Sequence, residues 1–365
     1  MNSKVVVVLP CHNQEDIIGI NISLLRDQTR PPDKVIVVDD HSDSFSLLED
    51  NFVKVVHGTS KGRSTTRNLG ISTALEEGAD ILVFMDGDSI VEDELYIERL
   101  LTHFQDSSES SLIFGTRIHT ERPLDLGRWV KGENVPRKRY QNKPSDLLTA
   151  NMDNLMVGND LDYRDLRVVA KVPENYAALT SFDEKADFIL TGMVTWACNF
   201  AVTATALRAI QGLMERVYGL KGMWFDEITF RTQWGYEDVA FGLDALFAGV
   251  DVQLQDDCRV VHFLHGRSDD LFVHIQGKHL IMNRYRELIR DKGTFSRRSL
   301  SDLFLEIDGR TFLLSNYGYG PVRVDGKYIQ IGKFVYDWEL GDFKKESLLR
   351  ICLSNLKNFF KRKYK

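Results

Sequence analysis

The chain has 365 residues, 43% hydrophobic and 27% charged, which is the composition of a globular protein long enough for one large domain with an extension or for two domains. Its formal net charge of −7 excludes a surface that is basic throughout, so we expect no nucleic-acid partner. The four cysteines are far apart and form no C-x-x-C pair. They suit a reducing, cytoplasmic location, and we expect buried free thiols.

The first third of the chain alternates strand and helix patterns. Apolar, β-branched runs predict strands at 4–9, 34–38, 54–57 and 80–85, and helical spacing predicts helices at 16–28 and 64–78. This alternation is typical of βαβ units in an α/β fold, with a mainly parallel central sheet flanked by helices. Ligands of such sheets bind beyond the carboxyl ends of the strands, where this chain places runs of polar residues.

The predicted strand at 80–85 ends in Asp86-Gly87-Asp88, for which three interpretations compete. The two carboxylates suit a divalent cation that binds phosphate oxygens. A phosphatase would use the first aspartate as its nucleophile. The pair would otherwise only cap the following helix. An EF-hand calcium loop is excluded, because Ile90 and Val91 stand where an oxygen ligand and a glycine are required.

Two further motifs carry charge. KGRSTTRNLGI (61–71) places Arg67 on a segment entering a helix, where its forked donors suit a diphosphate, unless it belongs to a solvated face. WGYEDVAF (234–241) begins an apolar helix with Glu237 and Asp238, which are either helix caps or sugar-binding and catalytic acids beside Trp234 and Tyr236.

The rest of the chain is less regular. The uncharged segment Phe188–Leu207 indicates a buried interior, with a transmembrane helix as the alternative. Later segments predict a helix at 271–291 and strands within 310–338 around a hairpin turn at 324–327. The tail 345–365 reads as a basic amphipathic helix that lies either on a membrane surface at its cytoplasmic face or against the domain.

These motifs, in this order, resemble the family 2 inverting glycosyltransferases, which have the GT-A fold and use nucleotide sugars. The segments that carry the resemblance are LPCHNQED, VIVVDDHS, KGRSTTRNLGI, VFMDGDS, TGMVTWACNFAVTATAL, WGYEDVAF and CRVVHFLH, and they span residues 3–270. The last two also resemble galactosyl- and N-acetylgalactosaminyl-transferring relatives. The resemblance implies a transferase domain at 1–270, with a nucleotide-binding half at 1–115 and an acceptor and catalytic half at 116–270, followed by a C-terminal α+β extension at 271–365.

The resemblance also implies roles for individual residues. The residues expected at the UDP-sugar are Pro10, Asn13, Glu15, Asp40, Arg67, Asp86 and Gly87. Asp88, Asp86 and His262 would hold Mn²⁺ or Mg²⁺, with His265 as the alternative to His262. Asp238 would be the catalytic base and Glu237 its partner, and Trp234 and Tyr236 would bind the acceptor. The family usually has a tyrosine where His12 stands, and a Gly-Gly turn where this chain has Thr191-Gly192.

The implied reaction is a metal-assisted single displacement in polysaccharide or glycoconjugate biosynthesis. It would move a hexose or N-acetylhexosamine from a UDP-sugar to a hydroxyl of a glycan, glycolipid or protein acceptor. The rival hypotheses are an aspartate-nucleophile phosphatase and a nucleotide-sugar-binding module without catalysis.

Overall fold

The computed structural model describes residues 3–58, 62–121, 139–142, 195–230 and 235–264, together with Arg284 and short strands between 293 and 344. The chain divides into two compact units, one of residues 1–150 and 165–268 and the other of residues 151–164 and 269–365. The described residues of the candidate site all belong to the first unit.

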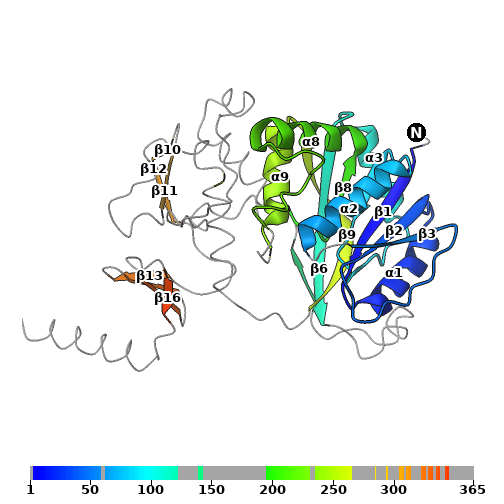
Figure 1. The fold of residues 1–365 in the computed structure, drawn as a ribbon, viewed down its shortest axis with the longest axis horizontal. Coiled ribbons are helices and arrows are strands. Elements are labelled where there is room, and N and C mark those ends of the chain that lie inside the picture. The colour runs from blue at the N-terminus through cyan, green and yellow to red at the C-terminus, as the bar shows by residue number, and fades with distance from the viewer. Residues whose placement is uncertain are drawn as a thin grey trace, which may run out of the picture. The chain divides into compact units, whose positions relative to one another are not determined.

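The first unit is built on one sheet with the strand order β3-β2-β1-β4-β8-β6-β9-β5, in which β7 also pairs with β6 (Figure 1). Its strands are β1 (Val5–Cys11), β2 (Lys34–Asp39), β3 (Val53–His57), β4 (Ile81–Phe84), β5 (Ser89–Ile90), β6 (Ser111–Glu121), β7 (Arg139–Asn142), β8 (Phe200–Thr203) and β9 (Asp251–Leu264). The expected parallel order is found from β3 to β4. Beyond β4 the sheet becomes mixed, because β8 runs antiparallel between β4 and β6, while β6 and β9 are parallel.

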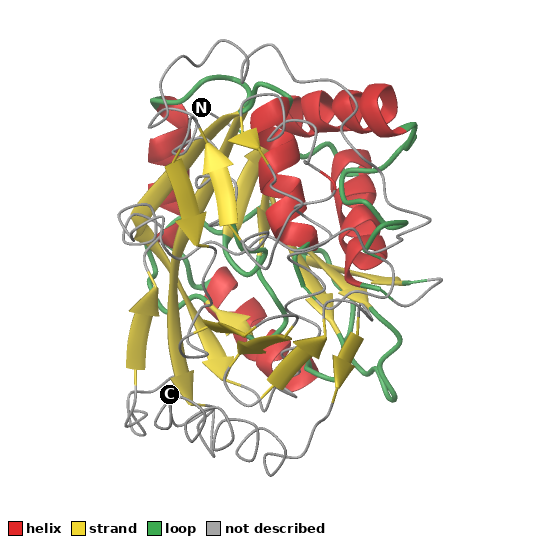
Figure 2. Ribbon diagram, turned by 90° about the vertical axis from the view of Figure 1, so that its left-hand side faces the viewer, coloured by secondary structure: helices red, strands yellow, loops and turns green. Residues whose placement is uncertain are grey.

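Helices cover both faces of this sheet, as Figure 2 shows in red against the yellow strands. The helices are α1 (Glu15–Arg26), α2 (Arg63–Glu76), α3 (Tyr96–Gln105), α8 (Ala204–Tyr218) and α9 (Glu237–Phe247). Successive side chains of a strand point to opposite faces. Val7 and Leu9 therefore pack in one core with Ile18 of α1 and Leu100 of α3, whereas Val8 points to the other face and meets α2.

The uncharged segment is part of the protein interior wherever the structure describes it. Residues 200–203 form β8 inside the sheet, and α8 follows directly. The Thr203 hydroxyl caps α8 by accepting a hydrogen bond from the Ala206 N–H at 3.2 Å. The expectation of a buried segment is confirmed for these residues, and the alternative of a transmembrane helix is wrong, because strand β8 interrupts the segment. None of the described helices combines the length and apolarity needed to cross a membrane.

Two small sheets belong to the second unit. Strands β10 (Gly293–Thr294), β11 (Phe304–Ile307) and β12 (Arg310–Leu313) form one antiparallel sheet, and β13 (Val322–Asp325), β14 (Tyr328–Ile331), β15 (Phe334–Asp337) and β16 (Asp342–Lys344) form the other. Asp325 pairs with Tyr328, which confirms the hairpin predicted at this point. The predicted tail helix, and all of the predicted helix at 271–291 apart from Arg284, lie outside the described residues.

The cysteine prediction holds where it is tested. Cys11, Cys198 and Cys258 are buried free thiols. Burial raises the pKa of Cys11 to about 11 and that of Cys198 to about 12, so both stay protonated at neutral pH. Cys352 lies outside the described residues.

Candidate functional site

The loops that follow β1 and β2 are tied to each other at the carboxyl edge of the sheet. The Asp40 N–H donates to the Cys11 carbonyl at 2.7 Å, and an imidazole nitrogen of His12 lies 2.8 Å from the Asp40 carbonyl. Asn13 has a left-handed φ of 57° and exchanges two hydrogen bonds with Asp43. The Asn13 side chain, which is expected to bind the nucleotide, therefore holds the loop after β1 against the loop after β2.

Asp39 and Asp40 have different surroundings although they are neighbours. Asp39 is buried and accepts hydrogen bonds from the Ser42 N–H at 2.9 Å and from His57 at 3.1 Å. Burial alone would raise the pKa of Asp39, but the bonds from Ser42 and His57 outweigh it and lower the pKa. Among the residues that the structure describes, the half-buried Asp40 carboxylate accepts one longer bond, 3.2 Å, from Gly62 at the start of α2. Asp40 is thus the better placed of the two to meet a ligand.

Gly87 is required by close packing. A Cβ atom at this position would lie 2.6 Å from the Pro10 carbonyl oxygen and 2.4 Å from the Gln14 side-chain oxygen. Real Cβ contacts are not this short, so any larger residue would push the Asp86-Gly87-Asp88 turn away from the loop after β1. Glu15 follows directly in the first turn of α1. The structure thus brings Pro10 and Glu15 to the same end of the sheet as the two aspartates.

Asp86, Asp88 and His262 form a cluster whose ligand atoms all lie within 4.8 Å of one another. The pairing of β5 with β9 sets Ser89 opposite His262, and the Phe263 N–H donates to the Asp88 carbonyl at 2.9 Å. The imidazole Nε2 of His262 lies 3.3 Å from Asp88 Oδ1. Two carboxylates and an imidazole are a donor set that fits Mn²⁺ well and Mg²⁺ through its oxygens.

Arg67 joins this cluster to the start of α9. Its guanidinium is 4% exposed and donates to Glu237 Oε1 at 2.5 Å and to Asp86 Oδ1 at 3.1 Å. Burial opposes the positive charge, but the charges of Glu237, Asp86 and Asp238 outweigh it and keep the pKa of Arg67 above its ordinary value. The carboxylates of Glu237, Asp86 and Asp238 thus outnumber the Arg67 guanidinium, and Asp88 adds a fourth carboxylate in the cluster with Asp86. This excess of negative charge suits a divalent cation.

Asp238 is held by the segment before β8. The Ala197 N–H donates to Asp238 Oδ2 at 3.2 Å, and the Val239 N–H donates to Oδ1 at 2.9 Å. Burial, followed by the charge of Glu237, raises the pKa of Asp238, and Arg67 and the two backbone donors oppose this effect; the net result is a rise from 3.8 to about 6. A carboxylate with this pKa can take up and release a proton near neutral pH.

The Glu237 carboxylate is held more tightly than that of Asp238. It is 2% exposed, and Arg67 engages its Oε1. Its Oε2 is buried and meets no hydrogen-bond partner among the residues that the structure describes. Tyr236, which precedes it, adopts a left-handed φ of 72° at the start of α9. Trp234 and His265 lie outside the described residues, so the expected acceptor contact and the alternative ligand are not placed.

Several residues of the site were not singled out from the sequence. The Asn199 side chain donates to the carbonyls of Thr116 and Cys258 at 2.8 and 3.0 Å and accepts from the Tyr96 hydroxyl at 2.6 Å. His119 of β6 packs edge-on against His262 at 5.2 Å between ring centroids. The uncharged segment was visible in the sequence, but strand β6 was not predicted, and only pairing across β6, β8 and β9 shows which of their side chains meet.

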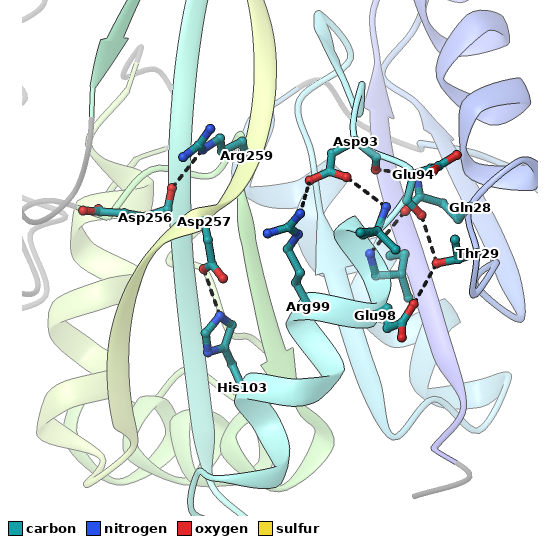
Figure 3. Close-up of polar contacts among 12 residues, drawn as sticks. Gln28, Thr29, Asp93, Glu94, Glu98, Arg99, His103, Asp256, Asp257 and Arg259 are labelled. Carbon is teal, nitrogen blue, oxygen red and sulfur yellow. Dashed lines mark hydrogen bonds and ion pairs between the residues drawn. The ribbon is translucent and has the colours of Figure 1, made fainter.

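A second group of potential metal ligands lies away from this site. His103 of α3 and Asp257 of β9 are 2.9 Å apart (Figure 3). Cys258 completes the group. The same view shows the separate pair of Asp93 and Arg99, 3.2 Å apart. Cys258 keeps its proton, because burial raises its pKa, and the hydrogen bond and charge of Asp257 raise it further. The group is a simple histidine–aspartate contact over a protonated thiol.

Comparison with known proteins finds a family match for part of the chain. Residues 6–159 match the family described as Glycosyl transferase family 2. The O-antigen chain rhamnosyltransferase RfbN of Salmonella typhimurium (strain LT2) is 29% identical over 108 residues, which are 28% of this chain and 34% of that protein. The chain therefore spans about a third of the length of the curated relative that it matches.

Solved structures with similar folds have low sequence identity. S. aureus TarS (residues 1–349) is 16% identical, with a TM-score of 0.41 over 77% of this chain and 66% of that chain. GalNAc-T7 with UDP, GalNAc and Mn²⁺ is 14% identical, with a TM-score of 0.44 over 75% of this chain and 47% of that chain.

Proposed function

We propose that the chain is a glycosyltransferase of family 2, whose model matches residues 6–159. Its first unit would transfer a sugar from a UDP-sugar to a hydroxyl group of an acceptor, with a divalent cation bound by Asp86, Asp88 and His262. The observation that carries the proposal is the buried guanidinium of Arg67, which connects this cluster to Glu237 beside Asp238. A diphosphate-binding group and a carboxylate with a raised pKa thus belong to one charged network.

The donor would be bound at the carboxyl edge of the sheet. Asp40 and Pro10, in the loops after β2 and β1, are the residues proposed to meet the uracil base. Mn²⁺ or Mg²⁺ in the cluster would neutralise the charge that develops on the departing diphosphate. The residues Asn13, Glu15 and Gly87 would act mainly by shaping this edge, since Gly87 packs against the loop after β1.

Asp238 would remove the proton from the acceptor hydroxyl. Its pKa of about 6 is raised enough to accept a proton and low enough to leave it ionised at pH 7. The hydroxyl oxygen would then attack the anomeric carbon from the face opposite the diphosphate, with inversion. A double displacement would need a side chain that attacks the sugar itself. Glu237 is paired with Arg67 and is poorly placed to do so, which supports a single displacement. Glu237 would instead position the base, and Tyr236 and Trp234 would meet the acceptor.

The acceptor is proposed to be a glycan of a cell-surface polysaccharide or glycoconjugate, and a glycolipid or protein is the alternative. The match to an O-antigen rhamnosyltransferase supports a polysaccharide. We place the enzyme in the cytoplasm, where contact of residues 345–365 with a membrane would bring it to a lipid-linked acceptor. Residues 1–115 would form the nucleotide-binding half of a domain that ends near 270, and residues 271–365 its extension. Liposome co-sedimentation with and without residues 345–365 tests the membrane contact.

A donor screen tests the proposed function. UDP-Gal, UDP-GalNAc, UDP-Glc and UDP-GlcNAc are incubated with the protein and Mn²⁺, and release of UDP is measured with and without EDTA. A nucleotide-activated rhamnose is included because of the rhamnosyltransferase relative. Metal-dependent release from one UDP-sugar is expected. Release from the rhamnose donor alone contradicts the UDP-sugar assignment, UDP binding without release indicates a binding module, and turnover of an aryl phosphate indicates a phosphatase.

A further inference from the structure

Arg117 of β6 has an unusual environment for an arginine. Its guanidinium carbon lies 4.7 Å from the centroid of the Trp196 ring, a distance at which a cation is attracted to the aromatic face. Trp196 is itself buried, and its ring N–H donates to the Gly115 carbonyl at 3.1 Å. The ring is therefore fixed, and it holds the half-buried Arg117 in one direction.

Trp196 adjoins the proposed base. The residue before it, Thr195, donates its hydroxyl to the Asp238 carbonyl at 3.0 Å, and the residue after it, Ala197, donates its N–H to the Asp238 carboxylate at 3.2 Å. Arg117 is also near the metal cluster, since His119 is two residues further along the same face of β6 and contacts His262.

The positive charge of Arg117 is not neutralised by an ion pair within the described part of the chain. Arg67 is engaged by Glu237 and Asp86, whereas no carboxylate of the described residues pairs with Arg117. Its Nε atom is buried and meets no hydrogen-bond acceptor there. A partly desolvated cation without an anion costs free energy. The charges of Arg117, Asp86, Asp88 and Asp238 all act on the pKa of the buried Cys198 thiol, so Arg117 and these carboxylates lie within electrostatic range of one residue.

Resting on the proposed glycosyl transfer, we propose that Arg117, held by Trp196, is an acceptor subsite that binds an anionic group, a carboxylate or a phosphate ester, on the acceptor. The donor's diphosphate is the less suitable occupant. It would be met by the cluster of Asp86, Asp88 and His262, whereas Trp196 stands next to the carboxylate that would deprotonate the acceptor. An acceptor that places its anion on Arg117 would present a neighbouring hydroxyl to Asp238.

Binding of small anions to the protein–UDP–Mn²⁺ complex tests this subsite. Glucuronic acid supplies a carboxylate and glycerol 3-phosphate a phosphate ester, and glucose and glycerol are their neutral counterparts. Titrations are followed by calorimetry for the wild type, Arg117→Met, Arg117→Lys and Arg208→Met. Methionine keeps a flexible chain on the Trp196 ring, and lysine keeps the charge. Arg208 is an exposed arginine of α8 whose guanidinium donates to the Thr205 hydroxyl of the same helix, so its variant is the control for loss of one positive charge.

In the wild type, at least one anion is expected to bind saturably and more tightly than its neutral counterpart. Arg117→Met should weaken that binding by about tenfold or more, because a hydrogen bond to a charged group is lost. Arg117→Lys should retain part of it, and Arg208→Met all of it. UDP affinity should change by less than about twofold in Arg117→Met, which separates the acceptor side from the donor side.

Three results would overturn the subsite: no saturable binding of either anion, equal anion affinity in Arg117→Met and the wild type, or a loss of UDP affinity in Arg117→Met as large as the loss of anion affinity. The proposed function fails separately, if the wild type does not bind UDP in the presence of Mn²⁺. In that case the same anion titrations are made on the protein without UDP and Mn²⁺, and either of the first two results would again overturn the subsite.

Discussion

Arg67 of α2 and Glu237 of α9 form a buried ion pair 2.5 Å long although 170 residues separate them in the chain. The Nη2 atom of the same guanidinium pairs with the Asp86 carboxylate. A single side chain thus joins the two acidic motifs of the site, and the five predictions below concern these motifs and the turn between Asp86 and Asp88.

Arg67→Met should destabilise the protein by about 3–5 kcal/mol, because it leaves the Glu237 carboxylate buried without its cation. Replacing both partners, Arg67→Met with Glu237→Gln, should recover a large part of the loss. Urea denaturation measures both effects. Arg26→Met is the matched control, since Arg26 pairs with Asp50 at the surface, where loss of an ion pair has little effect. Equal losses in Arg67→Met and Arg26→Met would show that the buried pair does not stabilise the fold.

Asp238→Asn should lower transfer by about 10²–10⁴-fold while UDP affinity stays nearly unchanged, because only the proton acceptor is removed. Wild-type turnover should fall as the pH drops below about 6, where Asp238 becomes protonated. Once the donor screen has found a substrate, initial rates between pH 4.5 and about 8.5 measure this profile. Full turnover in Asp238→Asn would remove Asp238 from the role of base.

Ionisation of Asp238 has opposite effects on activity and stability: turnover requires the ionised carboxylate, but its ionisation lowers the free energy of unfolding. Its pKa is about 6 in the folded protein and near 3.8 in an unfolded chain, so the folded state binds more protons between these values, and stability falls as the pH rises through this window. Asp238→Asn removes the penalty and should raise the free energy of unfolding at pH 7 by about 1–3 kcal/mol. The gain should vanish below pH 3.8. Denaturation at both pH values checks it, and an unchanged stability at pH 7 would contradict the raised pKa.

Asp88→Asn and His262→Ala should each weaken Mn²⁺-dependent binding of UDP by at least about tenfold, because each removes a ligand of the proposed ion. EDTA should abolish the metal-dependent part in the wild type. His103→Ala is the control, because His103 also contacts an aspartate but lies at the second histidine–aspartate contact (Figure 3). Calorimetry with UDP and Mn²⁺ measures all four proteins. If His103→Ala loses as much affinity as His262→Ala, the cluster at Asp88 is not the metal site.

Gly87→Ala should impair UDP and metal binding without a change of charge, since its Cβ would meet the Pro10 carbonyl oxygen at 2.6 Å and force the turn to move. Gly19→Ala, in the exposed middle of α1, is the matched substitution with nothing within 4 Å of the new methyl group. It should stabilise the protein by about 0.5–1 kcal/mol. UDP titrations and thermal unfolding of the two variants separate them, and normal UDP affinity in Gly87→Ala would show that the turn tolerates the methyl group.

Much of the first unit could be predicted from local patterns. The apolar runs of β1, β2 and β4 are each bounded by polar residues, and the helical spacing of apolar residues within 16–28 predicts α1, although which side chains it buries, Ile18 and Ile22 among them, is seen only in the structure. These patterns depend on residues a few positions apart, so they survive in a single sequence. The antiparallel strand β8 could not be predicted in this way, because its run of small apolar and threonine residues is equally typical of a buried helix.

By itself, the sequence determined the order of strands and helices in the first third, the resemblance to family 2 glycosyltransferases, and the types of residue at the site. It did so because periodicity and motif spacing are local properties of the chain. Only the tertiary structure decided that Arg67 joins Glu237 to Asp86, that His262 lies against Asp88, and that Arg117 rests on Trp196. Each of these contacts joins segments far apart in the chain, and the register of the sheet and the packing of helices on it bring them together.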